Sequence, residues 1–200
     1  MAVGTGYRYP YYASYSASGN SVTYSNLASL GRGVSMDWDI DVSDSNIFYA
    51  DDVQAEEAGG IFQSGTGTAV IDGLEMTVAA KILGLPATRN KTVGGSTVTV
   101  QGFSDNKPPF VGIGFIKKTM MNGSTAYLPI VFPKVRFNQP GGSLATQQEE
   151  IDWQTQELSF TIMRDDTTNA EWMYCPQTAM ANELDAINFI RVCLGGAVSA

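Results

Sequence analysis

The clearest pattern of apolar and polar positions lies in the middle of the chain, over residues 110–166. Two extended apolar runs, 111–118 and 127–137, stand on either side of Asn122-Gly123. Asn-Gly between apolar runs is typical of a β-hairpin, because both residues tolerate the positive φ of a tight turn. A third extended run covers residues 151–164. We therefore predict three long strands, joined in order into one sheet.

Residues 34–42 show the strictest alternation in the chain. The apolar positions are Val34, Met36, Trp38, Ile40 and Val42, and the carboxylates between them are Asp37, Asp39 and Asp41. This pattern predicts a half-buried strand with its apolar row on the core and its carboxylates on the opposite face. A core cannot hold three unpaired carboxylates, so we expect them to face water. Carboxylates in a straight row diverge, which disfavours a shared metal ion.

The third extended run changes parity along its length. Its early apolar residues, Ile151 and Trp153, are odd-numbered, whereas the later ones from Leu158 to Ile162 are even-numbered. A shift of one residue turns every side chain to the other face of a sheet. We therefore predict a β-bulge within residues 154–157.

Two segments have the apolar period of a helix. In the first, Asp72 is the expected N-cap, and Gly84 and Pro86 end about three helical turns. The second is a C-terminal helical extension over about residues 178–195, with acidic residues near its start and Gly195-Gly196 at its end. Each has a single apolar stripe, so each is expected to pack on the sheet.

The first 33 residues form an arm rich in tyrosine and serine. Tyr7, Tyr9 and Tyr11 are spaced by two, which places them on one face if the segment is a strand. Two interpretations stay open. The tyrosine face is a contact surface for another protein, or the arm is a solvated edge hairpin that turns near Gly19-Asn20.

The remaining segments are short strands and polar loops. We predict strands over residues 47–50, 97–103 and 171–174, and a turn-rich loop over residues 89–95. Residues 44–68 and 138–150 are long polar excursions, and such segments often carry contacts with a neighbour. The candidate contact residues in them are Asp51, Asp52, Glu56, Glu57, Gln139, Gly141, Gly142 and Gln147.

Composition limits the classes of function. The 200 residues suffice for a single domain over 1–200, and the net charge is −8. The best cationic cluster is Lys117-Lys118, so tight nucleic-acid binding is not expected. There is neither a long apolar run nor a secretory pattern at the start, so we expect no membrane span and no export signal. Cys175 and Cys193 are expected to be reduced and buried.

The residues that usually carry catalysis are missing or isolated. The chain has no histidine, which removes the commonest general base and metal ligand. The two cysteines have no evident partner base. The adjacent carboxylates Asp165-Asp166 and Glu149-Glu150 are typical of turns. We therefore expect no enzyme, no cofactor and no metal site.

The order of short motifs along residues 34–175 resembles that of a known protein family. The motifs are Phe48-Tyr-Ala-Asp-Asp52, a Gly-rich break, a strand ending Ile71-Asp-Gly-Leu74, a helix closing Lys81-Ile-Leu-Gly84, a hairpin ending Pro133-Lys-Val-Arg-Phe137, and the segment Ile151-Asp-Trp-Gln-Thr-Gln-Glu-Leu-Ser-Phe-Thr-Ile-Met-Arg-Asp165. This order is similar to that of the major tail (tail tube) proteins of long-tailed bacteriophages, in particular the phi13-type branch. The Tyr-rich arm and the C-terminal helix lie outside the resemblance.

The resemblance implies a mainly β fold, a β-sandwich or partly rolled sheet with one flanking helix. Including the C-terminal helix, the chain would be α+β by content. It also implies a structural virion protein that forms hexameric rings, stacked into the tube through which DNA is ejected. Such a protein assembles in the host cytoplasm, and its expected partners are its own copies and other tail proteins (tape measure, terminator and distal tail). DNA would pass without specific binding.

Within this resemblance the predicted sites gain roles. Asp37, Asp39 and Asp41 become candidates for the tube lumen, where an acidic wall repels the phosphate backbone. The two polar excursions become candidates for contacts between rings. Two alternatives stay open: the tube protein of a contractile injection or secretion system, and a monomeric carbohydrate-binding β-sandwich. The latter would use Trp38, Trp153 or Trp172 as a stacking platform.

Overall fold

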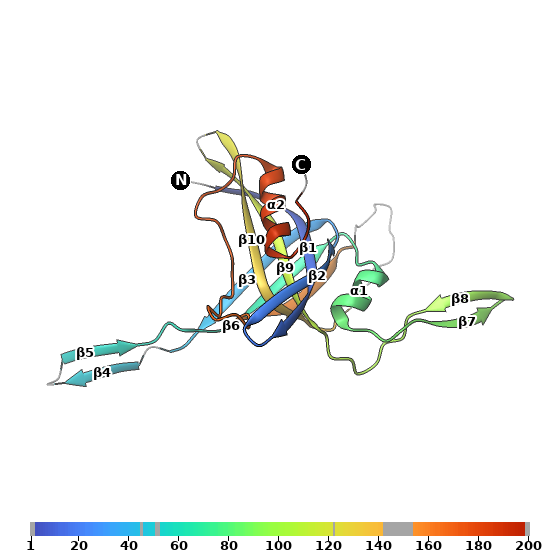
Figure 1. The fold of residues 1–200 in the computed structure, drawn as a ribbon, viewed down its shortest axis with the longest axis horizontal. Coiled ribbons are helices and arrows are strands. Elements are labelled where there is room, and N and C mark those ends of the chain that lie inside the picture. The colour runs from blue at the N-terminus through green and yellow to red at the C-terminus, as the bar shows by residue number, and fades with distance from the viewer. Residues whose placement is uncertain (1–2, 45, 51–52, 122, 142–153, 199–200) are drawn as a thin grey trace.

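The protein is mainly β, with two short helices, as predicted (Figure 1). The computed structural model describes residues 3–44, 46–50, 53–121, 123–141 and 154–198. A seven-stranded antiparallel sheet has the strand order β2-β1-β9-β10-β11-β6-β3. Its strands are β1 (Val3–Ser18), β2 (Ser21–Ser29), β3 (Gly33–Val42), β6 (Phe62–Ile71), β9 (Phe110–Met121), β10 (Ser124–Phe137) and β11 (Gln156–Met163).

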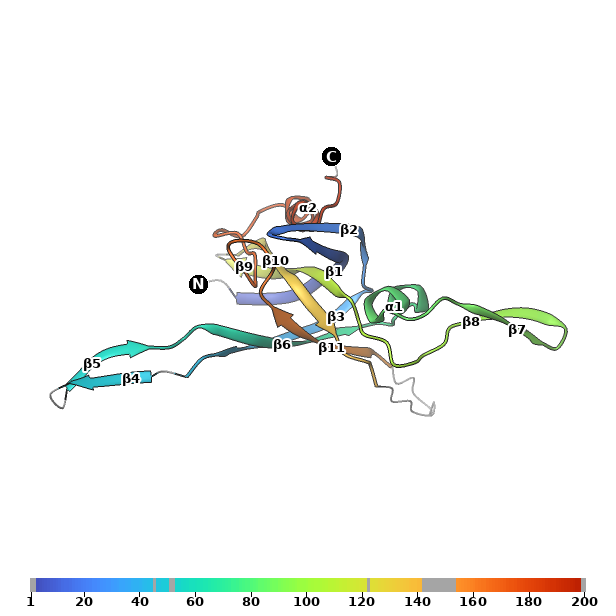
Figure 2. The ribbon, with the colours of Figure 1, turned by 60° about the horizontal axis from the view of Figure 1, so that its bottom comes forward.

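Four further strands form two separate hairpins, and two helices complete the fold. The strands are β4 (Asn46–Ala50), β5 (Val53–Ala58), β7 (Arg89–Val93) and β8 (Ser96–Val100), and the helices are α1 (Met76–Leu83) and α2 (Glu183–Cys193). The β4–β5 and β7–β8 hairpins project from the sheet in opposite directions along the longest axis of the molecule (Figures 1 and 2). Among the described residues, neither helix has the length and apolar character needed to cross a bilayer.

The three consecutive strands predicted in the middle of the chain are β9, β10 and β11, and they are neighbours in the sheet. Gly123, in the turn between β9 and β10, has a φ of 79°, as the Asn-Gly signal requires. The predicted bulge over residues 154–157 is wrong. The strand β11 begins only at Gln156 and pairs with β6 without a register shift. Alternate residues of β11 therefore keep to the same face of the sheet along the whole strand. Ile151 and Trp153 lie outside the described residues.

The sheet is rolled, so that its edge strand β3 covers the core formed by β9 and β10. The Trp38 ring lies 5.6 Å from the Phe115 ring and 5.9 Å from the Phe132 ring, measured between centroids. Glycines in β6 make this closure possible. A Cβ on Gly67 would collide with the Phe160 ring, and one on Gly65 would lie 2.7 Å from Cδ1 of Ile40. Large side chains from the neighbouring strands occupy the space above these glycines.

The opposite side of β1, β9 and β10 is covered by α2. Its buried residues Ala186 and Ile190 pack with Ala13, Ile116 and Val131 in a second apolar cluster. The side chain of Asn182 caps the helix by accepting a hydrogen bond from the backbone N–H of Leu184 at 3.1 Å. Gly195, just after the helix, has a φ of 69°. The predicted C-terminal helix and its glycine stop are confirmed.

The first predicted helix exists, but it is shorter than expected. The helix α1 spans eight residues from Met76, and Glu75 occupies the N-cap position without a side-chain capping bond. The predicted N-cap, Asp72, is wrong because its carboxylate is bound elsewhere. It accepts a hydrogen bond from the N–H of Arg32 at 2.9 Å and pairs with Nε of Arg32 at 3.4 Å. Gly84 closes the helix in the left-handed conformation, as predicted.

The tyrosine-rich arm is the β1–β2 hairpin, which turns at Gly19-Asn20 as one interpretation proposed. It belongs to the sheet, because β1 pairs with β9. The prediction that Tyr7, Tyr9 and Tyr11 share a face is wrong. The register shifts between Arg8 and Tyr11, and Tyr9 has a φ of 53°. Tyr7 consequently packs in the main core and Tyr11 against the α2 cluster.

The four smaller segments predicted from the sequence differ in outcome. The strand expected at residues 47–50 is confirmed as β4, whereas the loop expected at residues 89–95 contains β7. The strand β8 ends at Val100 and pairs only with β7, because both are exposed and stand away from the sheet. Residues 171–174 form no strand; Tyr174 makes a single bridge to Val131.

Candidate assembly surfaces

The three predicted carboxylates lie on β3, which pairs with β6 on one side and ends the sheet on the other. Asp37, Asp39 and Asp41 are all exposed, as the alternation predicted. Two of them accept hydrogen bonds from residues close by in the sheet. Asp39 Oδ1 accepts from the N–H of Ile40 at 3.0 Å, and Asp41 Oδ2 accepts from Oγ of Ser64 on β6 at 3.4 Å. No metal-binding group of three or more His, Cys, Asp or Glu side chains occurs among the residues that the structure describes.

These carboxylates belong to a wider surface, which we call the polar face. Residues that lie opposite each other on neighbouring strands share a face, so the pairings of β3, β6, β11 and β10 define its members. They are Ser35, Asp37, Asp39, Asp41, Ser64, Thr66, Thr68, Val70, Glu157, Ser159, Thr161, Met163, Lys134 and Arg136. The polar face therefore runs from an acidic edge on β3, across mostly short hydroxyl side chains, to the two cations of β10.

The two edges of the sheet differ in regularity. On β2 the pairing with β1 is broken by a bulge, where Asn26 has a φ of 55°. On β3 the register shifts only near the two ends, next to Gly33 and Val42. A bulge protects an edge strand from pairing with another chain, whereas a long regular edge is open to it. The first residue of β3, Gly33, lies against the Tyr7 ring of β1, so the part of the β3 edge beyond this contact is the better site for pairing with a second molecule.

The apolar row of β3 is only partly covered. Met36 and Ile40 pack on the core, but Val34, Trp38 and Val42 are 55%, 36% and 54% exposed. Exposed apolar residues on an open strand edge are unusual for a protein that remains alone in solution. Their side chains would be covered if a second strand extended the sheet beyond β3.

Beside β3 lies a seam, where the rolled sheet brings the first half of β1 close to β3. The seam contains a cavity of about 240 Å³ lined by Gly4, Gly6, Tyr7, Met36, Trp38, Phe115 and Lys117. The Tyr7 hydroxyl is buried at this seam and has no hydrogen-bond partner among the described residues. Burial raises the pKa of Tyr7 far above its ordinary value of 10.0, so the hydroxyl keeps its proton.

The structure describes only some residues of the two predicted contact segments, 44–68 and 138–150. Glu56 and Glu57 lie in β5, opposite Phe48 and Ile47 of β4. Asp51 and Asp52 lie outside the described residues, as do Gly142 and Gln147 of the second segment. Gln139 and Gly141 are exposed directly after β10, and the Gly141 carbonyl accepts a hydrogen bond from Nε2 of Gln156 at 3.4 Å.

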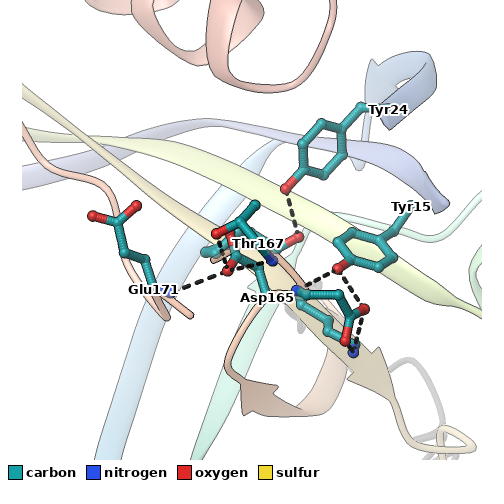
Figure 3. A network of polar contacts seen from close by, with 8 residues as sticks. Tyr15, Tyr24, Asp165, Thr167 and Glu171 are labelled. Atoms are coloured by element: carbon teal, nitrogen blue, oxygen red, sulfur yellow. Dashed lines mark hydrogen bonds and ion pairs between the residues drawn. The ribbon is translucent and has the colours of Figure 1, made fainter. Parts of the chain in front are cut away.

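A polar network fastens the segment that follows β11 to the rest of the sheet (Figure 3). Asp165 is 4% exposed, and its carboxylate accepts hydrogen bonds from Thr167, from the N–H of Glu171 and from the Tyr174 hydroxyl. The Tyr174 bond is 2.7 Å long. Asp165 has a bonded donor for each oxygen, so its role is to hold this turn.

The neighbouring Asp166 joins three distant parts of the chain. It pairs with Nζ of Lys134 on β10 at 2.7 Å and accepts from the Tyr15 hydroxyl of β1 at 2.7 Å. The hydrogen bonds from Lys134 and then Tyr15 lower the pKa of Asp166 below its ordinary value. The sequence correctly predicted turn residues here. It gave no sign of these partners, which lie 32 and 151 positions away.

The two cysteines are free thiols, as predicted, but their expected burial is wrong, because Cys175 is exposed and Cys193 is only half-buried. Burial raises the pKa of Cys193 to about 11 and also raises that of Cys175. Both therefore carry a protonated, weakly nucleophilic thiol at neutral pH.

The tryptophans of the binding-module alternative pack against other aromatic rings. Trp172 stacks on Phe62 at 5.2 Å with an interplanar angle of 7°, and Trp38 contacts Phe115 and Phe132. Trp153 lies outside the described residues. Phe62 covers one face of Trp172, and Trp38 packs on two core rings and is only 36% exposed, which disfavours both as flat sugar platforms.

Comparison with known proteins found no relative of this chain in the two sets compared. Neither the models of known protein families nor the curated proteins contain a match to this chain.

Proposed function

We propose that this protein is a structural subunit that assembles into stacked rings and forms the tail tube of a long-tailed bacteriophage. The observation that carries the proposal is the edge of β3: a regular, ten-residue strand at the end of the sheet with three partly uncovered apolar residues. Pairing with the next subunit would satisfy the edge backbone and bury these side chains. Closing the ring would cover the β3 edge of every subunit.

The polar face supports the further proposal that it lines the channel. Three carboxylates stand at its acidic edge, and its centre consists mostly of hydroxyl side chains together with Glu157. Repeated around a ring, the carboxylates would give a negative wall, which repels the phosphate backbone of DNA. The hydroxyls offer no fixed charge to hold a passing strand. DNA would therefore slide through the channel without specific binding.

In this proposal the partners are other copies of the chain and the remaining tail proteins, namely the tape measure, terminator and distal tail proteins. The protein would assemble in the host cytoplasm and end in the virion tail. A contractile injection or secretion tube would use the same edge and the same channel, and the test below applies to it equally.

Lysine substitutions on the β3 edge test the proposal. Val34→Lys/Val42→Lys places a charge on each exposed valine of this edge, and such charges prevent strand pairing. We expect a folded protein that no longer forms rings in electron micrographs. Val192→Lys is the matched control, because Val192 is a 64% exposed valine on α2, away from the edge. Normal rings from the double variant would overturn the proposed role of β3.

A further inference from the structure

The cavity at the seam between β1 and β3, which we call the seam cavity, has mostly apolar walls. Phe115 packs against two other rings that line it, with centroids 5.5 Å from Tyr7 and 5.6 Å from Trp38. Gly4 and Gly6 also line the cavity, and because they carry no side chain they leave room for a bound molecule. Aromatic rings and a glycine-containing strand thus border a space of about 240 Å³.

The two polar side chains that line this cavity are both hydrogen-bond donors. Tyr7 of β1 and Lys117 of β9 lie directly opposite each other in the sheet, so their side chains stand side by side on one face. The Tyr7 hydroxyl is buried and has no partner among the described residues. Burial also raises the pKa of Tyr7 above its ordinary value of 10.0, so the hydroxyl remains a donor.

The cation of the pair is available as well. Lys117 is exposed, and none of the ion pairs among the described residues includes it. Its Nζ lies 3.9 Å from the position that a Cβ on Gly4 would occupy, which places the ammonium group over the glycine that borders the cavity. The described lining contains no carboxylate. The seam cavity therefore combines one buried neutral donor with one positive charge.

The size and chemistry of the cavity together select a class of ligand. A dry protein cavity of about 150 Å³ holds benzene, so the seam cavity has room for a hydrocarbon body somewhat larger than one ring. Apolar walls favour such a body. A neutral donor beside a cation favours a group that is negative and only accepts hydrogen bonds, and a carboxylate is such a group. A bare inorganic anion would leave the aromatic walls without a partner.

We propose that the seam cavity binds a small apolar monocarboxylate, with a hydrocarbon body of about six to nine carbons. Its carboxylate accepts a hydrogen bond from the Tyr7 hydroxyl and pairs with the Lys117 ammonium group. Its hydrocarbon body packs on the rings of Phe115 and Trp38. All of these groups belong to one copy of the chain, so binding does not require assembly. The bound acid also gives the Tyr7 hydroxyl the partner that a buried polar group otherwise lacks.

The probe for this site is 3-phenylpropionate, and its uncharged counterpart of the same shape is 3-phenylpropanamide. Trp38 lines the cavity, so tryptophan fluorescence of dilute protein reports the binding. For a ligand of this size we expect a dissociation constant of about 1 mM or below. The amide should bind at least about threefold more weakly, because it cannot pair with a cation.

Two substitutions remove one donor each and leave the shape of the cavity in place. Tyr7→Phe should weaken binding of 3-phenylpropionate by at least about tenfold, because a buried hydrogen bond to a charged group is lost. Lys117→Met should weaken it by about threefold at low salt, because the lysine is exposed and its charge is screened. The matched controls are Tyr11→Phe, whose ring packs in the α2 cluster, and Lys118→Met, on the opposite face of β9.

Binding by wild type and both controls, with weaker binding by the two cavity variants, supports the site. Circular dichroism checks the fold of every variant, and Lys117→Met decides the test if Tyr7→Phe does not fold. The proposal is wrong if wild-type protein shows no binding at about 10 mM 3-phenylpropionate. It is equally wrong if the amide binds as tightly as the acid, or if the folded cavity variants bind the acid as tightly as wild type.

Discussion

The ring of Tyr7 on β1 lies directly against the backbone of Gly33, the first residue of β3, so that a Cβ on Gly33 would collide with the ring. This contact joins the two strands that form the seam of the rolled sheet. Tyr7 also packs edge-on against Phe115, with ring centroids 5.5 Å apart. The absence of a side chain at Gly33 thus permits the closure of the seam.

Gly33→Ala should therefore destabilise the protein, by about 1–3 kcal/mol, the usual cost of overpacking a core. The cause is steric, because the added methyl group displaces the Tyr7 ring. Chemical denaturation measures the free energy of unfolding. Gly73→Ala is the control, since a Cβ there meets nothing within 4 Å. Equal stability of the two variants would show that the seam is not closely packed.

Tyr7→Phe should leave the free energy of unfolding unchanged or raise it, because it removes a buried hydroxyl without a partner among the described residues. The comparison is Tyr174→Phe, whose hydroxyl donates to Asp165 at 2.7 Å. Losing that donor leaves a buried carboxylate less satisfied, at a cost of about 1–3 kcal/mol. A large loss of stability in Tyr7→Phe would mean that its hydroxyl has a partner.

Stability should fall in acid partly through Asp166. Its pKa is lowered in the folded state, so its contribution is complete above the ordinary pKa of 3.8 and is lost as the pH falls through the folded pKa. Asp166→Asn should therefore be less stable than wild type at neutral pH, and this difference should shrink below pH of about 4. Thermal unfolding across pH measures it. A difference that stays constant into strong acid would contradict the pairing with Lys134.

The proposed channel role of Asp37, Asp39 and Asp41 is tested by replacing all three with lysine. Tubes should still assemble, because all three carboxylates are exposed and those of Asp39 and Asp41 bond within β3 and to the adjacent β6. DNA ejection should slow or stall, because repeated rows of cations attract the phosphate backbone. Particles that eject DNA at the wild-type rate would place these residues outside the channel.

Much of the sheet could be predicted because its signals are local. The alternation of residues 34–42 and the Asn122-Gly123 turn each depend on neighbours in sequence, and both predictions agree with β3 and the β9–β10 hairpin. The helix stop at Gly84 depends on one backbone conformation. Each of these features is determined within a few residues, which is why sequence patterns reveal them.

The errors have a common physical origin in long-range contacts. The alternation of Tyr7, Tyr9 and Tyr11 is broken by a bulge against β9, and Asp72 is drawn from its helix by Arg32. The strand β7 was not predicted, because residues 89–95 lack the alternation of apolar and polar positions that a half-buried strand shows, and β7 is exposed along its whole length. The partners of Asp166 are likewise distant in sequence.

The central claim is that this chain assembles through its own surfaces. Sedimentation velocity and negative-stain electron microscopy of the purified wild-type protein, over a series of rising concentrations, test it most directly. The account predicts rings or stacked tubes, with a sedimenting species many times the mass of the chain. A species that remains at 21.5 kDa at the highest concentration, with no rings in the micrographs, would contradict it.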